Sequence, residues 1–118
     1  MSADRALKLK SVLKRAPGNS PTKNMELLMS TLGTSTIVPD VDKYYVFVYK
    51  AKTPGIAYDQ HPLVLVTAIF QWGFTGFSSH WNDSRQYTWQ EVISNLYEVE
   101  QDEVSLVSQI PIAKIKRS

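Results

Sequence analysis

Residues 63–81, LVLVTAIFQWGFTGFSSHW, decide the fold. The first eight, 63–70, form the most apolar run in the chain and favour a central β-strand. Residues 71–73 have the composition of a tight turn, and residues 74–81 then predict a returning strand. Gly76, in the middle of this second run, indicates a bulge or a close approach of two backbones. Strands joined by so short a turn pair antiparallel, because a parallel pair needs a crossover of about a dozen residues.

The flanking segments extend this β pattern in both directions. Residues 44–49 are all β-branched or aromatic, which predicts a strand with both faces at least partly covered. After an Asn-Asp-Ser turn, residues 85–87 are expected to form a short extended piece. Residues 110–115 alternate like an edge strand, with Pro111 at a site that donates no ladder hydrogen bond. We therefore expect a mainly β fold with short helices, a small twisted antiparallel sheet or SH3-like barrel over residues 43–113.

One short helix is expected inside this β-rich domain. Thr88 is followed three residues later by Glu91, the spacing of a capping box, in which the two side chains satisfy backbone amides at a helix N-terminus. Apolar residues continue at helical spacing, so the pattern predicts a helix near residues 88–97.

The two ends of the chain differ from the middle in composition. All thirteen aromatic residues lie between Tyr44 and Tyr97, whereas residues 1–24 contain six basic residues and one acid. Because large rings stabilise small cores, the middle of the chain is expected to hold the core. We expect residues 1–42 to be a basic, partly helical N-terminal arm that reaches away from the β-rich domain, and residues 114–118 a basic tail.

Two helices are predicted inside this N-terminal segment. Residues 3–16 carry apolar side chains at spacings of three and four. Residues 21–32 begin with a proline after Ser20, a favourable N-cap, and are followed by Gly33, a favourable stop.

Composition excludes several classes of protein. With no cysteine, the chain has no disulfide, no thiolate nucleophile and no cysteine-based zinc site. No apolar run approaches the roughly 18 residues of a membrane span. The basic N-terminal residues are not followed by the apolar stretch of a secretory signal. A soluble, intracellular protein is expected.

Candidate catalytic and metal-binding residues are few. Asp59, His61 and His80 have the donor types of a two-histidine, one-carboxylate metal site. The alternative is structural, with Asp59 capping the turn before His61 and His80 bonded at a strand end. Ser79 precedes His80, but neighbouring strand residues point to opposite faces, which argues against a nucleophile–base pair. We expect no catalytic residue, no metal and no cofactor, and therefore not an enzyme.

Cations and exposed rings are the candidate binding residues. The basic N-terminal residues suit phosphates or acidic protein, although their alternative is a solvated helix face. Rings on a small sheet near cations suit nucleic-acid bases, although most such rings belong to the core. The candidates are Arg5, Lys8, Lys10, Lys14, Arg15, Lys50, Lys52, Trp72 and Arg85.

Short motifs in the middle of the chain carry a resemblance. They are KTP at 52–54, YDQHPL at 58–63, GFTGF at 73–77 and HW at 80–81, in that order. In this order the chain resembles small proteins of tailed bacteriophages, notably those infecting marine bacteria and cyanobacteria. The resemblance covers residues 44–97 and implies a virion or assembly component, or a small DNA-associated factor, in the host cytoplasm or the virion. It implies no catalytic residue.

Two functions follow as expectations. The first is a non-enzymatic phage structural or assembly protein whose arms dock on neighbouring subunits in an oligomer, since assemblies stabilise small subunits by burial between chains. The alternative is a small nucleic-acid-binding protein that uses the basic arm and exposed aromatic side chains. Neither function involves a membrane.

Overall fold

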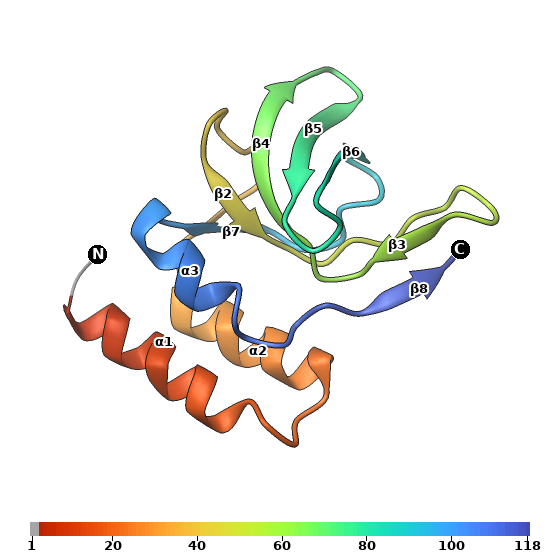
Figure 1. Cartoon of the computed structure of the whole chain (residues 1–118). Coiled ribbons are helices and arrows are strands. Elements are labelled where there is room, and N and C mark those ends of the chain that lie inside the picture. Colours follow the sequence, from red (N-terminus) through yellow and green to blue (C-terminus); the bar gives the residue numbers. More distant parts are fainter. Residues whose placement is uncertain (1–2) are drawn as a thin grey trace.

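The computed structural model of this chain describes residues 3–118, which form a mainly β fold with short helices. The larger sheet has six antiparallel strands, in the spatial order β1 (Ser35–Thr36), β7 (Leu96–Val99), β2 (Tyr44–Val46), β4 (Leu63–Ile69), β5 (Gly73–Ser78) and β6 (Asp83–Thr88). A second sheet pairs β3 (Ala57–Asp59) with β8 (Ile115–Arg117). The expected fold class is therefore confirmed. Within the described residues no pairing joins β1 to β6, so the sheet is open (Figure 1).

The predicted central hairpin is present as β4 and β5. Phe70 and Gly73 close its turn by exchanging backbone hydrogen bonds of 2.7 and 3.3 Å. Val66 pairs with Gly76, and the register then shifts by one residue, which places the bulge on β4 and not on the glycine-containing strand. The expected close approach is at Gly76 itself, where an added Cβ would lie 2.9 Å from the Leu65 carbonyl oxygen.

The larger sheet buries side chains on both faces, as predicted for residues 44–49, although the strand itself, β2, is shorter than predicted and ends at Val46. Tyr45 belongs to an aromatic cluster on one face, where Phe47 packs edge-on against Phe74 and Tyr87 at centroid distances of 5.7 and 5.3 Å. Val46, the next residue along β2, belongs to a second cluster that includes helix residues. Alternation along one strand therefore divides the core into an aromatic side and a helix side.

The two predicted N-terminal helices are confirmed as α1 (Ala3–Arg15) and α2 (Pro21–Leu32). The Ser20 hydroxyl accepts the Lys23 amide at 3.1 Å, which caps α2. Gly33 ends α2 with a φ of 70°, in the left-handed region that favours glycine.

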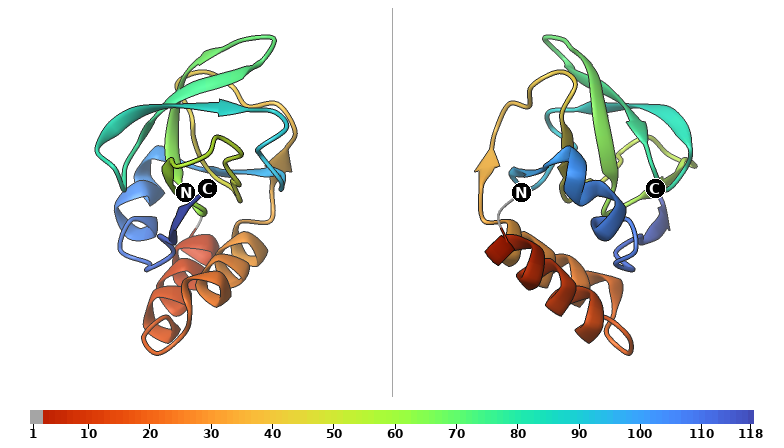
Figure 2. Two further views of the ribbon diagram at one scale, coloured as in Figure 1. Left: turned by 90° about the vertical axis from the view of Figure 1, so that its right-hand side faces the viewer. Right: turned by 60° about the vertical axis from the view of Figure 1, so that its left-hand side comes forward.

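The expectation that these helices reach away from the β-rich domain is wrong. Leu9, Val12 and Leu28 are fully buried in the same cluster as Val46 and Leu63 of the sheet. Figures 1 and 2 show α1 and α2 side by side against one side of the sheet. The physical reason is that the sheet has a second apolar face, and the helix stripes are the surfaces that cover it.

The predicted helix near residues 88–97 is also wrong. Thr88 ends β6, a turn follows, and the chain pairs with the sheet again through a Tyr49–Val92 bridge and then β7. The Thr88 hydroxyl donates to the Glu91 carboxylate at 2.6 Å, so neither side chain makes the capping contacts. Pairing with the 48–50 backbone replaces further helical bonds, because Lys50 N–H donates to Glu91 O and Ile93 N–H donates to Val48 O.

The C-terminal part differs from expectation in two ways. The edge strand predicted at 110–115 lies instead at β8, so part of the expected tail at 114–118 is paired with β3. No element is predicted for residues 100–109, where the structure has a 3₁₀ turn, η1 (Gln101–Glu103), followed by the short helix α3 (Val104–Val107). Among residues 3–118, no helix is long and apolar enough to cross a membrane.

Candidate functional site

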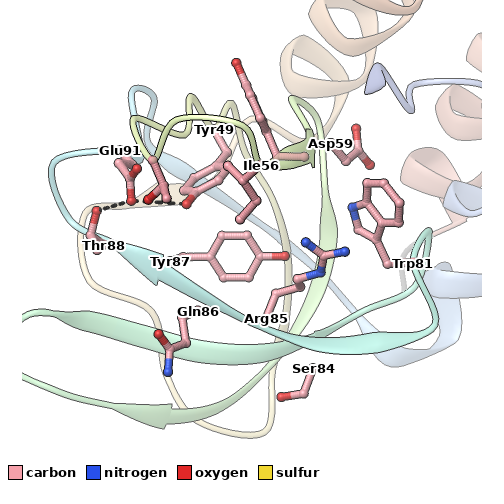
Figure 3. Close-up of a pocket in the computed structure, with 12 residues that line it drawn as sticks. Tyr49, Ile56, Asp59, Trp81, Ser84, Arg85, Gln86, Tyr87, Thr88 and Glu91 are labelled. Atoms are coloured by element: carbon pink, nitrogen blue, oxygen red, sulfur yellow. Dashed lines mark hydrogen bonds between the residues drawn. The ribbon is translucent and has the colours of Figure 1, made fainter. Parts of the chain in front are cut away.

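A pocket of about 300 Å³ lies between β6 and the segment that runs from Tyr49 to Asp59. Aromatic side chains form much of its wall. Tyr49 packs edge-on against Tyr58 and Tyr87, at centroid distances of 5.9 and 4.9 Å. Trp81 lies at the end of the pocket away from Tyr49 (Figure 3). We call it the Arg85 pocket, after the one cation among its lining residues.

Arg85 reaches this pocket from the middle of β6, where it pairs across the sheet with Gly76. Its guanidinium lies over the Trp81 ring, 4.5 Å from the centroid, a cation–π contact. Nη1 donates to the Ala57 carbonyl at 3.4 Å. Nε is buried and has no hydrogen-bond partner among the described residues. The Nε–H group of Arg85 is therefore a buried donor without an acceptor among the described residues.

Asp59 lies at the Trp81 end of the pocket and accepts three hydrogen bonds. One carboxylate oxygen accepts the backbone amides of His61 and Lys114, at 3.0 and 2.9 Å, and the other pairs with Nδ1 of His80. Burial would raise the pKa of Asp59, but the bonds from His80, Lys114 and His61 outweigh it and hold the pKa below its usual value. Asp59 is therefore an ionised structural anchor.

Glu91 lies at the opposite end of the pocket (Figure 3). Its carboxylate accepts the Tyr49 hydroxyl at 3.1 Å, the Thr88 hydroxyl and the Lys52 amide. Burial acts to raise the pKa of Glu91, but these three bonds lower it overall. Burial also raises the pKa of both Tyr49 and Tyr87, so the two phenols stay neutral.

Neither carboxyl group of the pocket has the raised pKa of a general acid. A general acid needs a carboxyl group whose pKa is raised toward neutrality, and both pocket carboxyls are shifted the other way. Ser79, the residue next to His80, is exposed and makes no hydrogen bond to that histidine among residues 3–118. The two pocket carboxylates are therefore ionised hydrogen-bond acceptors.

The three residues considered for a metal site are only partly brought together. Asp59 contacts His80 through its side chain but contacts His61 through the backbone amide. The His61 ring turns away, with Nδ1 2.8 Å from the Ile112 carbonyl oxygen. Within the part of the chain that the structure describes, no group of three or more acidic or histidine side chains is placed to hold a metal.

A second surface lies at the tip of the β4–β5 hairpin. Phe70 and Trp72 stack with centroids 5.1 Å apart and ring planes 6° apart, and they remain 44% and 43% exposed. Trp72 shares a hollow with Trp89, and Trp89 shares another, of about 250 Å³, with Ile37 and Val38. We call these five residues the aromatic ridge.

The predicted binding residues are distributed over separate surfaces. Four of them lie exposed on α1: Lys8, Lys10, Lys14 and Arg15. Arg5 is instead a structural residue, because Nε lies 2.7 Å from the buried Glu103 carboxylate. Lys52 and Trp72 line one hollow, and Arg85 lines the pocket. Lys50 is exposed.

Several residues of these surfaces were not singled out from the sequence. Tyr58, Trp81 and Tyr87 line the Arg85 pocket, and Phe70 and Ile37 belong to the ridge. Their aromatic or aliphatic character alone does not separate them from core residues.

Comparison of the chain with models of protein families, with curated proteins and with solved structures found no match in any of the three.

Proposed function

We propose that the protein is a non-enzymatic structural or assembly protein that binds neighbouring copies of itself, of the kind that small tailed-phage proteins supply. The observation that carries the proposal is the exposed stack of Phe70 and Trp72 on a hairpin tip. Clustered exposed apolar side chains mark interaction sites, and tryptophan is enriched among the residues that dominate binding energy.

The N-terminal helices contribute differently from the expected free arm. Their apolar stripe is used in the chain's own core, so a neighbour would meet the outward faces, of which that of α1 carries an exposed leucine. That face carries Leu7, which is 65% exposed, with Lys10 and Lys14 one and two turns further along.

The two surfaces are complementary. The ridge residues Ile37 and Val38 lie in a loop that also carries two exposed acids, Asp42 and Asp40, of which Asp40 lies 3.4 Å from the Lys43 ammonium. The α1 face is basic around a single leucine. Because α1 and the hairpin tip lie at opposite ends of the molecule (Figure 1), contact between them is heterologous and extends into a ring or filament.

Sedimentation velocity over a concentration series tests this. Replacing Phe70 and Trp72 by serine, or Leu7 by serine, should each return the protein to a monomer. Phe77→Ser is the matched control, because Phe77 is a similarly exposed ring on β5 that lies outside the ridge. A monomeric wild type at all concentrations, or assembly that survives both ridge and Leu7 replacements, would contradict the proposal.

A second candidate, nucleic-acid binding, is favoured by one observation. Four cations are exposed on α1, and only Lys8 has an acidic neighbour on that helix, Asp4 at 4.0 Å. Duplex binding should then weaken with salt, with a slope of about 0.9 per neutralised phosphate. Replacing Lys8, Lys10, Lys14 and Arg15 by glutamine should flatten that slope. Absence of binding at low salt removes this candidate.

A further inference from the structure

We propose that the Arg85 pocket is a binding site for a small aryl carboxylate, whose carboxylate group pairs side-on with Arg85. This inference is independent of self-assembly, because the pocket and the aromatic ridge have no residue in common.

The free edge of the guanidinium determines the ligand's chemistry. Nη1 is engaged by the Ala57 carbonyl, whereas Nε is buried without an acceptor among the described residues. A buried donor left unpaired is destabilising. The edge formed by Nε and Nη2 presents two parallel donors, which match the two oxygens of a carboxylate.

The pocket's own acids do not fill this role. Asp59 accepts three hydrogen bonds, from His61, Lys114 and His80, and Glu91 accepts three from Tyr49, Thr88 and Lys52. Neither acid forms an ion pair with Arg85 in the part of the chain that the structure describes. Both carboxylates are bonded to other groups of the protein. An anion that pairs with Arg85 would therefore come from a bound ligand.

The wall of the pocket selects a flat apolar body. Tyr58 and Tyr87 both pack edge-on against Tyr49, and Ile56 adds an aliphatic side chain to the same lining. The Tyr87 hydroxyl points toward Arg85 (Figure 3). A volume of about 300 Å³ is at the lower end of small-molecule sites, so it suits one ring and not a polymer.

The experiment uses the full chain and the indole N–H signals of its three tryptophans in proton–nitrogen NMR spectra. Sodium benzoate is the probe, benzamide is the neutral analogue of the same shape, and inorganic phosphate is the other oxyanion. We expect benzoate to shift the Trp81 signal saturably, while Trp72 and Trp89 move little. Benzamide and phosphate should bind about tenfold more weakly or worse.

Two variants test the role of Arg85. Arg85→Gln should weaken benzoate binding by about tenfold or more, and Arg15→Gln, which changes an exposed arginine on α1, should leave it unchanged. Absence of a saturable Trp81 shift overturns the proposal, as does equal affinity for benzoate and benzamide, or tighter binding of phosphate. If Arg85→Gln does not fold, Arg85→Lys and the benzoate–benzamide comparison on the wild type decide the question.

Discussion

The carboxylate of Asp59 contacts Nδ1 of His80, and the same carboxylate accepts the backbone amides of His61 and Lys114. One side chain therefore joins β3, the turn after β5 and the segment that leads into β8. Its side chain is fully buried, so loss of its charge cannot be compensated by water.

We predict that Asp59→Asn destabilises the protein by about 3–5 kcal/mol, the range for breaking one partner of a buried charged pair. Urea denaturation measures the free energy of unfolding. Asp83→Asn is the control, because Asp83 is exposed on β6, and it should change stability by less than about 0.5 kcal/mol. Equal effects of the two variants would show that Asp59 is not an anchor.

Stability should fall with acidification in two stages. Burial lowers the pKa of His61 from 6.5, so below that pH the unfolded chain takes up a proton that the folded chain does not. The associated stability is present above 6.5 and is lost as pH falls toward the folded pKa. The pKa of Asp59 is lowered from 3.8, so its contribution is present above that pH and is lost at more acidic pH.

Urea denaturation at a series of pH values and constant ionic strength measures both stages. His61→Gln should flatten the profile between about pH 7 and the folded pKa of His61, and should leave the more acidic stage in place. A profile that is unchanged by His61→Gln would rule out this histidine as the source of the first stage.

Removal of Arg5, which forms an ion pair with Glu103, should destabilise the protein more than removal of any other cation on α1. Glu103 is fully buried and pairs with Arg5 at 2.7 Å, so removal of the guanidinium leaves a buried carboxylate without its cation. Arg5→Ala is expected to cost about 3 kcal/mol. Arg15→Ala, on the exposed face of the same helix, should cost less than about 0.5 kcal/mol by the same urea measurement.

The helices of the N-terminal segment were predictable from sequence, but their position was not. Apolar spacing that includes Leu9 and Val12 shows that one helix face is covered. It does not show by what, because an apolar stripe is equally compatible with another subunit. The covering surface is supplied by Val46 and Leu63, whose strands were predicted separately, and only the three-dimensional arrangement joins the two patterns.

The candidate site shows the same limit of sequence-based prediction. Asp59 and His80 were recognisable by their chemistry, and the structure pairs them. The metal alternative fails at His61, whose ring is held by the Ile112 carbonyl, a backbone group that no side-chain pattern reveals. The Thr88–Glu91 spacing was also a real local signal, but the Glu91 carboxylate bonds to Tyr49, 42 residues away, and the strand pairing prevails over the helix.

The last prediction concerns Trp89 and Trp72, two neighbouring rings with different roles. Trp89 is half-buried, packs 5.5 Å from Phe74 in the aromatic core, and donates Nε1–H to the Gln71 carbonyl at 2.9 Å. Trp72 is more exposed and stacks on Phe70. Trp89→Ala should therefore cost about 2 kcal/mol, below the range of about 3–5 for a fully packed ring, and should lower the melting temperature by several degrees.

Trp72→Ala should leave the melting temperature nearly unchanged and weaken self-association, because its ring stabilises the ridge and not the core. Calorimetry and sedimentation velocity on the two variants separate the effects. Trp89→Ala is expected to reduce assembly as well, since the Gln71 carbonyl loses the hydrogen bond from Trp89 Nε1–H that holds the hairpin tip against the turn after β6. Equal losses of stability in both variants would place Trp72 in the core and remove it from the proposed interface.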